Sequence, residues 1–233
     1  YNGQILAQYA KQHLPNYQVF DEKRYFISGN QMVCAEIAGI KVALTVCEDI
    51  WHEGPAIQAK AADADVILNL NASPFHLNKQ SEREQMLAAR AKQAGLPIVY
   101  VNQVGGQDEL VFDGGSMVVN ACGTLVHRAP LFESSITAVS AQLGSSGLVF
   151  NAAKLADNPA HLPCVYQALV TGVRDYVNKN GFKSVVLGLS GGIDSALTLA
   201  IAVDALGAQR VEAVMMPFKY TSALSQNDAA EQA

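Results

Sequence analysis

The chain has 233 residues, half of them hydrophobic, and a formal net charge of -5. This length can bury a sizeable core in one large or two smaller domains, and the mild acidity excludes the strongly basic surface that a nucleic-acid partner requires. No apolar run approaches the ~20 residues of a membrane span, so no membrane association is expected. Four cysteines without C-x-x-C spacing exclude a disulfide scaffold and a zinc site, and indicate the reducing cytoplasm.

Strands and helices alternate through the first part of the chain. A strand-like run at 4–10 comes first, and the apolar pattern then predicts strands over 33–36 and 41–46, a helix over 55–64, and strands over 66–70 and 97–101. Ser81 as N-cap, Glu84 three residues later and Gly95 after the last turn predict a helix over 81–94. Residues 116–120 and 124–128 flank a turn and predict a hairpin, which completes a mixed α/β sheet.

A second ordered region follows a weakly patterned stretch. We predict a first domain over 1–133, a linker over 134–160 and a second domain over 161–233. The second domain contains a helix over 165–180, a strand over 184–189, a helix to 206, a strand over 211–215 and a helical stretch over 224–233. This order predicts the start of a doubly wound parallel sheet, in which ligands bind at the carboxyl ends of the strands. Because the chain starts with Tyr1 and stops within a helical stretch, we expect an internal piece of a longer protein.

The turn between the strand over 184–189 and the following helix has the sequence SGGIDS, at residues 190–195. Adjacent glycines allow positive φ, and backbone N–H groups at a helix N-terminus attract anions. The lysine of the Walker pattern is missing, so this is a different kind of phosphate loop. The turn resembles the SGGxDS loop of the ATP pyrophosphatases, and this resemblance implies that the phosphate-binding residues are Gly188, Leu189, Ser190, Gly191, Gly192, Ile193, Asp194 and Ser195. Asp194 either holds a Mg²⁺ ion that bridges the phosphates or interacts with the helix dipole.

A cysteine ends the strand over 41–46. Cys47 taken alone could be a core residue, but an upstream loop rich in polar and aromatic groups, residues 11–26, indicates a thiol activated by its surroundings. His13, His52 and His76 lie near these motifs without the spacing of a metal site.

These motifs resemble two known families. Residues 190–195 resemble the SGGxDS loop of the ATP pyrophosphatases, while TVCEDIW at 45–51, NASPF at 71–75 and VNQVGGQDEL at 101–110 resemble the nitrilase, or carbon–nitrogen hydrolase, superfamily. Their combination resembles the glutamine-dependent NAD⁺ synthetase family. The resemblance implies a nitrilase-like α-β-β-α sandwich followed by the start of a doubly wound, parallel-sheet ATP-pyrophosphatase domain.

The resemblance also implies roles for individual residues. Cys47 matches the nucleophile of a Glu–Lys–Cys triad and Lys11 matches its lysine, while the glutamate base would precede Tyr1. Glu22 resembles a second carboxylate near the lysine, although a surface or structural role is equally open. The residues that would hold glutamine are Tyr17, Ser73 and Lys79, with Arg83 as an alternative partner for the substrate carboxylate. Glu48, beside the nucleophile, would either meet the glutamine amino group or orient the loop.

The implied reaction uses ATP and Mg²⁺, the latter held by Asp194, to adenylate deamido-NAD. Ammonia released from glutamine then gives NAD⁺, AMP and pyrophosphate, with glutamate as the second product. Nitrilase-like domains commonly pair, so a homo-oligomer is expected. The alternatives are another SGGxDS amidotransferase, a stand-alone carbon–nitrogen hydrolase that leaves the loop unexplained, and a non-enzymatic scaffold with an unreactive Cys47.

Overall fold

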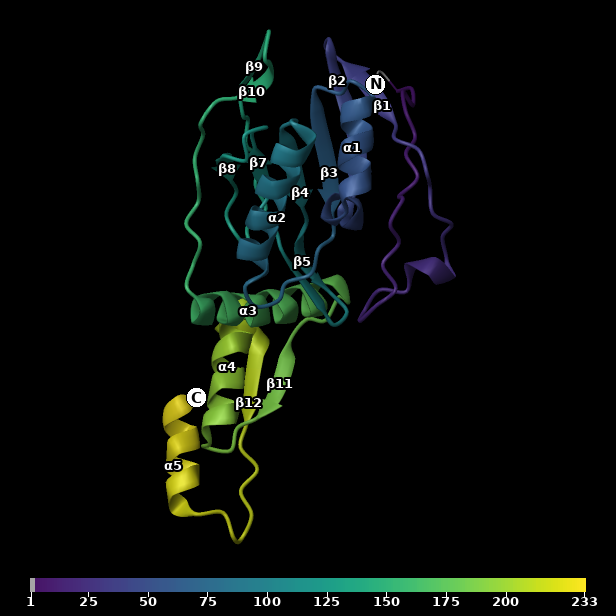
Figure 1. Cartoon of the computed structure of the whole chain (residues 1–233). Helices are drawn as coiled ribbons and strands as arrows, with labels where there is room; N and C mark the ends of the chain where they lie inside the picture. Colours follow the sequence, from purple (N-terminus) through teal and green to yellow (C-terminus); the bar gives the residue numbers. More distant parts are fainter. Residues whose placement is uncertain (1–2) are drawn as a thin grey trace. The chain divides into compact units, whose positions relative to one another are not determined.

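The computed structural model describes residues 3–233, which divide into two compact units (Figure 1). Unit 1 comprises the described residues up to Val104 together with Asp113–Asn158, and unit 2 comprises Gly105–Phe112 together with Pro159–Ala233. Residues 105–112 therefore lie inside the predicted first domain in sequence but pack with the second unit in space. No helix among residues 3–233 is both long and apolar enough to cross a bilayer.

Unit 1 is built on a six-stranded mixed sheet with the strand order β1-β2-β3-β4-β7-β8. The three central strands β2, β3 and β4 are parallel, and the outer pairs are antiparallel. The strands are β1 (Cys34–Ile37), β2 (Ile40–Val46), β3 (Val66–Asn71), β4 (Ile98–Asn102), β7 (Met117–Val119) and β8 (Leu125–Arg128). The predicted hairpin of residues 116–128 is thus confirmed as β7 and β8.

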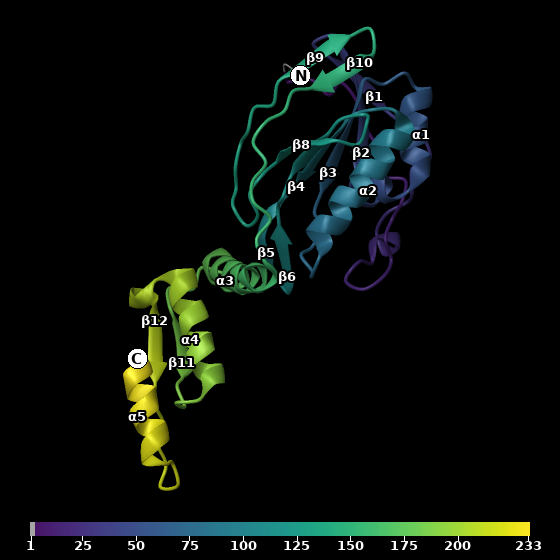
Figure 2. The same cartoon turned by 60° about the vertical axis from the view of Figure 1, so that its left-hand side comes forward.

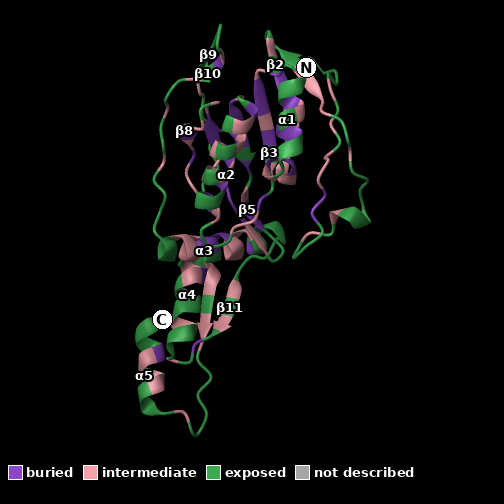
Figure 3. Ribbon diagram, viewed as in Figure 1, coloured by how far each residue is buried: buried purple, intermediate pink, exposed green. Residues whose placement is uncertain are grey.

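Helices α1 (Glu53–Ala61) and α2 (Lys79–Ala94) cover one face of this sheet (Figure 2). Ala43, Ile67 and Ile98, which are paired neighbours on β2, β3 and β4, are fully buried in one cluster with Leu87 of α2. Figure 3 shows the central strands largely in the colour of buried residues. Burying each large aliphatic side chain contributes about 1.5–3 kcal/mol. The mixed α/β class is confirmed, and the unit shows one helical layer on a sheet.

Two sequence-based expectations for unit 1 differ from the structure. Residues 4–10 form no strand, because within residues 3–233 no neighbouring strand pairs with them. The region predicted as a linker contains the hairpin of β9 (Ala141–Gly144) and β10 (Gly147–Phe150). Leu148 of β10 packs on Val42 and Val66 on the sheet face away from the helices, so hydrophobic contact orders this segment.

Helix α2 begins earlier than its sequence predicts. Its N-cap is Asn78, at φ 65° and without a side-chain capping bond, so the predicted cap Ser81 lies inside the helix. The C-terminal prediction is confirmed, because Gly95 adopts φ 65° and donates its N–H to Ala91 at 2.8 Å.

Unit 2 pairs β11 (Val185–Gly188) in parallel with β12 (Val211–Val214). The long helix α3 (His161–Lys179) packs against α4 (Ile193–Leu206), which follows β11 directly, and α5 (Ala223–Gln232) closes the chain. The hairpin of β5 (Val104–Gln107) and β6 (Leu110–Asp113) lies against α3 (Figures 1 and 2). The strand–loop–helix–strand order predicted for this region is confirmed.

Candidate active site

Cys47 occupies a strained backbone position at the carboxyl end of β2. It is the first residue of the 3-10 helix η2 (Cys47–Trp51), and its φ is 47°, in the left-handed region that costs a non-glycine residue about 1–3 kcal/mol. Such strain persists only where the surroundings enforce it, and it is concentrated at functional sites. The sharp turn places the Cys47 thiol beside the Ala72 N–H, which donates to it.

The fully buried carboxylate of Asp49 organises this turn. Its Oδ2 accepts the Val46 N–H at 3.1 Å and the Tyr9 hydroxyl at 2.8 Å, while Oδ1 accepts the N–H groups of Gln12 at 3.1 Å and His13 at 2.8 Å. These bonds join the segment that carries Lys11 to the turn that carries Cys47. Asp49 is part of the TVCEDIW motif at 45–51, but its role was not predicted. Its place in the sequence beside the apolar Ile50, which the structure buries fully, is the signal that could have indicated a buried carboxylate.

Lys11 and Glu22 form a close ion pair beside the thiol. Lys11 Nζ donates to both Glu22 carboxylate oxygens, at 2.8 and 2.7 Å. Burial is the main cause that raises the pKa of the Cys47 thiol, whereas the Lys11 charge and the Ala72 N–H oppose this shift and Glu48 and Glu22 add to it. An open cavity of about 700 Å³ borders Lys11 and Glu22. The site therefore combines a thiol with a cation that borders this cavity, which is also lined by Val46, the residue before Cys47.

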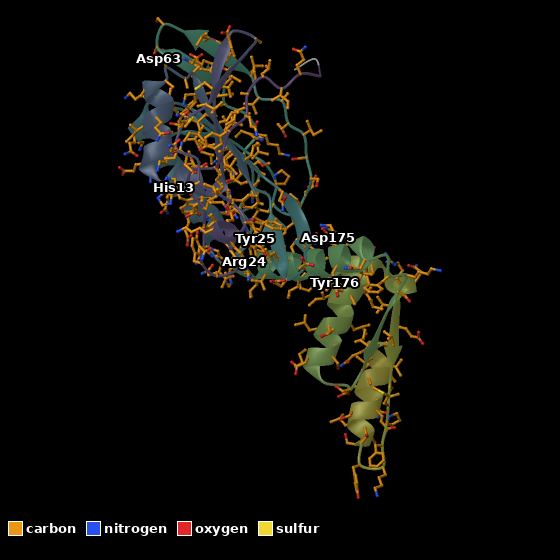
Figure 4. The ribbon with its side chains drawn as sticks, turned by 90° about the vertical axis from the view of Figure 1, so that its right-hand side faces the viewer. His13, Arg24, Tyr25, Asp63, Asp175 and Tyr176 are labelled. Carbon is orange, nitrogen blue, oxygen red and sulfur yellow. The ribbon has the colours of Figure 1, made fainter. Side chains whose placement is uncertain are left out.

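The structure brings Tyr17 and Glu48 together. The Tyr17 hydroxyl donates to Glu48 Oε2 at 2.9 Å, and burial followed by this bond raises the pKa of Tyr17 to about 12. The other carboxylate oxygen, Oε1, lies 3.5 Å from His52 Nε2. The His52 ring stacks on His13, labelled in Figure 4, with ring centroids 3.9 Å apart. Tyr17 and His52 therefore hold Glu48 in place directly after the nucleophile Cys47 in the sequence.

Ser73 is fixed by a buried polar network. Its N–H donates to Asn102 Oδ1 at 2.9 Å, and its carbonyl and hydroxyl oxygens accept Arg83 Nη2 at 2.9 and 3.1 Å. Arg83 is fully buried and pairs with Asp113 at 2.8 Å. The prediction that Arg83 could bind the substrate carboxylate is therefore wrong, because its guanidinium is committed to Asp113 and to the 73–74 backbone.

Lys79 lies in the first turn of α2 rather than in a loop. Its Nζ is 4.2 Å from the centroid of the Trp51 ring and 3.4 Å from Glu82 Oε2. The cation–π contact places Lys79 on the last residue of η2, the element that starts with Cys47. Its predicted contact with glutamine stays a prediction.

In unit 2 the SGGIDS segment forms a compact turn after β11 and continues into the first turn of α4, which begins at Ile193. Ser190 and Ser195 bond through their hydroxyls at 3.1 Å, and the Ser195 hydroxyl also donates to the Gly192 carbonyl at 2.9 Å. Gly191 has φ 81°, and a Cβ there would collide with the carbonyl oxygen of Ser225. Ser190, Gly192, Ile193 and Asp194 are exposed, and a cavity of about 240 Å³ lies between residues 188–190 and the segment after β12. This geometry can hold an anion at the start of α4.

Asp194 stands exposed in the first turn of α4. No group of three or more histidine, cysteine or acidic side chains suited to a metal gathers anywhere in residues 3–233. One carboxylate fits Mg²⁺ chemistry nevertheless, because Mg²⁺ commonly takes one or two carboxylates and completes its shell with water and substrate phosphates.

The fold and the cysteine site together define a class of protein. The sequence profile of the carbon–nitrogen hydrolase family matches residues 1–149, and the chain belongs to this family. A second profile, described as NAD synthase, matches residues 165–233. Both resemblances noted in the motifs are thereby confirmed.

Relatives that match both segments identify the group more closely. The glutamine-dependent NAD⁺ synthetase of Acinetobacter baylyi is 46% identical over 233 residues, covering 100% of this chain and 42% of its own length. The corresponding Aquifex aeolicus protein is 42% identical, covering 98% of this chain and 46% of its own length. The solved structure of glutamine-dependent NAD⁺ synthetase from Acinetobacter baumannii in complex with ADP superposes with a TM-score of 0.92 at 48% identity, covering 99% of this chain and 43% of that one. The chain thus spans less than half the length of these relatives.

Proposed function

We propose that the chain provides the glutamine-hydrolysing site and the ATP phosphate loop of an enzyme that converts deamido-NAD to NAD⁺. The reaction consumes ATP and glutamine and yields AMP, pyrophosphate and glutamate. The observation that carries the proposal is the presence, on one chain, of a strained cysteine beside a Lys–Glu pair and of a separate SGGIDS anion loop. A stand-alone amidase would need only the first of these.

In the glutaminase half, Cys47 Sγ attacks the amide carbon of glutamine. The thiol proton leaves the sulfur, the C–N bond breaks with protonation of the nitrogen, and the products are ammonia and an enzyme thioester. Water then hydrolyses the thioester to glutamate and restores the thiol. Lys11 stabilises the developing negative charge on sulfur or on the amide oxygen, and Glu22 orients Lys11 through their bidentate bond.

Glutamine is held by the groups around this thiol. Glu48 carries the negative charge that suits the substrate ammonium, and the Tyr17 hydroxyl fixes its orientation. The backbone around Ser73, immobilised by Arg83 and Asn102, forms a rigid wall of the site. Lys79 supplies a cation for the substrate carboxylate, and for this role it gives up its contacts with the Trp51 ring and with Glu82.

In the synthetase half, the loop from Gly188 to Ser195 binds the phosphates of ATP through its backbone N–H groups and serine hydroxyls. Because these hydroxyls bond to one another and to the loop backbone in the free chain, ATP replaces internal bonds with bonds to its phosphate oxygens. Mg²⁺, held in part by Asp194, offsets the phosphate charge. The acceptor of the adenylyl group is the carboxylate of deamido-NAD.

The proposal also includes the cellular location and the oligomeric state of the enzyme. We place it in the cytoplasm, since Cys34, Cys47 and Cys122 are free thiols, and we expect it to act as a homo-oligomer. A monomeric mass in solution would contradict the second expectation.

The test uses the protein as its host produces it, with Mg-ATP and deamido-NAD, and compares wild type with Cys47→Ala. We expect wild type to form NAD⁺ from glutamine or from ammonium, and Cys47→Ala to form it only from ammonium. Release of pyrophosphate without formation of NAD⁺ from either nitrogen source would support the assignment of the phosphate loop and would reject deamido-NAD as the acceptor. Normal glutamine-driven synthesis by Cys47→Ala would reject the glutaminase assignment.

A further inference from the structure

Hairpin β5–β6 docks on α3 through the backbone N–H and C=O of a single residue, Gly106. The N–H of Gly106 donates to Asp175 Oδ2 at 2.8 Å, and Lys179 Nζ donates to the Gly106 carbonyl oxygen at 2.5 Å (Figure 4 labels Asp175). Both backbone groups of a single residue are thus satisfied by two side chains one turn apart on the same helix. We call this arrangement the Gly106 clamp.

The contact surface is built from glycine on both sides. A Cβ at Gly106 would lie 3.2 Å from the Cα of Gly172 in α3, and a Cβ at Gly105 would lie 2.7 Å from Asp175 Oδ2. A Cβ at Gly172 would in turn lie 3.3 Å from Val111 of β6. Side chains at these positions would hold the hairpin away from the helix, so the sequence GG at 105–106 is explained by this approach rather than by a turn.

The two roots of the hairpin end in the network that fixes Ser73. Asn102 stands four residues before Gly106 in the sequence, and its amide bonds both the N–H of Ser73, at 2.9 Å, and the carbonyl of Gly114, at 3.0 Å. At the other root Asp113 pairs with Arg83, which bonds Ser73 and Pro74. Ala72, directly before Ser73, donates its N–H to the Cys47 thiol.

We infer that Asp175 and Lys179 are positioning residues for the glutaminase site: by clamping Gly106 they fix the hairpin roots that hold Ser73 and its neighbours against Cys47. Neither residue touches the reacting atoms. Their effect passes through the backbone of β5 and β6 and through Asn102, Asp113 and Arg83. The inference rests on the proposed function, and it assigns residues in the sequence of the synthetase half to the geometry of glutamine hydrolysis.

The test loosens the clamp with conservative changes and matched controls. Gly106→Ala forces Gly172 away, whereas Gly144→Ala adds the same methyl where nothing lies within 4 Å. Lys179→Met removes the donor to Gly106, and Lys183→Met removes an exposed lysine of the same unit. Asp175→Asn keeps an acceptor for the Gly106 N–H and serves as the rescue variant for Asp175→Leu.

Three measurements distinguish a positioning role of these residues from a general loss of protein structure. We expect Gly106→Ala, Lys179→Met and Asp175→Leu to speed amide hydrogen exchange in the peptide containing Ser73 and to lower kcat/KM for glutamine hydrolysis about tenfold, as expected for a misplaced catalytic geometry. Ammonium-driven NAD⁺ formation should stay within about twofold, and the controls and Asp175→Asn should behave as wild type.

Unchanged exchange at Ser73 in all three clamp variants would overturn the inference, and so would equal losses in the glutamine-driven and ammonium-driven reactions. The exchange readout needs no turnover. If the wild-type protein hydrolysed no glutamine, the proposed function would fail, and the exchange data would still decide whether α3 fixes the Ser73 backbone.

Discussion

Lys11 Nζ bonds both carboxylate oxygens of Glu22, at 2.8 and 2.7 Å, while its charge also acts on the thiol of Cys47. One ammonium group therefore neutralises a carboxylate and opposes the effect of burial on a nucleophile. Because burial is the larger influence, the pKa of Cys47 stays above its usual range and the resting thiol is protonated at neutral pH. The proposed attack of Cys47 on glutamine then requires a base that takes the thiol proton.

This balance of charges predicts opposite shifts in two variants. Lys11→Met removes the charge that lowers the pKa of Cys47, so the pH at which the thiol becomes reactive should rise. Glu48→Gln removes a charge that raises this pKa, so that pH should fall. The measurement is the pH dependence of Cys47 alkylation by iodoacetamide, followed by mass spectrometry, with Cys34 as the internal reference. A shift in the same direction for both variants would disprove the electrostatic account.

Asp49 should prove essential for the fold of the site. In Asp49→Asn an NH₂ group replaces one carboxylate oxygen and cannot accept the two hydrogen bonds that this oxygen receives. Either the bonds from Val46 and Tyr9 or those from Gln12 and His13 are therefore lost. Hydrogen bonds to a charged group are worth about 1.5–3 kcal/mol each, so we expect a loss of about 3 kcal/mol in the free energy of unfolding in urea. Asp63→Asn is the control, because Asp63 is exposed and its φ of 52° suits asparagine (Figure 4). Equal stabilities for the two variants would refute this role.

Arg83 should matter for stability rather than for substrate affinity. Arg83→Met leaves the buried Asp113 carboxylate unpaired, and breaking a buried ion pair in this way costs about 3–5 kcal/mol. Arg24→Met breaks an ion pair whose side chains are 69% and 52% exposed, and it should change stability by less than about 1 kcal/mol. Urea unfolding of both variants measures the contrast. A stable Arg83→Met protein with a selectively raised KM for glutamine would restore Arg83 as a substrate ligand.

The phosphate loop predicts a local requirement for glycine. In Gly191→Ala the new methyl group meets the Ser225 carbonyl at a backbone φ of 81°, so the loop must open and ATP binding should fall at least about tenfold. Gly181→Ala has a similar φ of 73° with nothing within 4 Å, and it should bind ATP as wild type does. Calorimetric titration with Mg-ATP compares the two. The loop assignment fails if both bind ATP equally well.

Much of this architecture follows from local sequence. The apolar runs that became β2, β3 and β4 were predicted because parallel strands bury both faces, and Gly95 marked the end of α2 because a left-handed C-cap favours glycine. The start of α2 was missed because Ser81 and Glu84 match the capping-box pattern, whereas the actual N-cap, Asn78, makes no side-chain capping bond and leaves no such pattern.

The site was only partly predictable, for a different reason. Short sequence motifs identified Cys47 and Lys11, because the neighbouring residues in each segment were sufficient to indicate their chemistry. The roles of Asp49 and Arg83 depend on partners 30 or more residues away, such as Asp113 for Arg83, and no periodicity encodes such pairings. The docking of hairpin β5–β6 on α3 left one trace in the sequence, the glycine pair at 105–106, which only the structure explains.

The most direct test of the central proposal follows a nitrogen atom. The protein would be supplied with Mg-ATP, deamido-NAD, glutamine labelled with ¹⁵N in its side-chain amide, and unlabelled ammonium, and the NAD⁺ formed would be weighed by mass spectrometry. We predict labelled NAD⁺ from wild type and unlabelled NAD⁺ from Cys47→Ala. Unlabelled NAD⁺ from wild type, or equal labelling in both proteins, would contradict the proposal that Cys47 supplies the amide nitrogen.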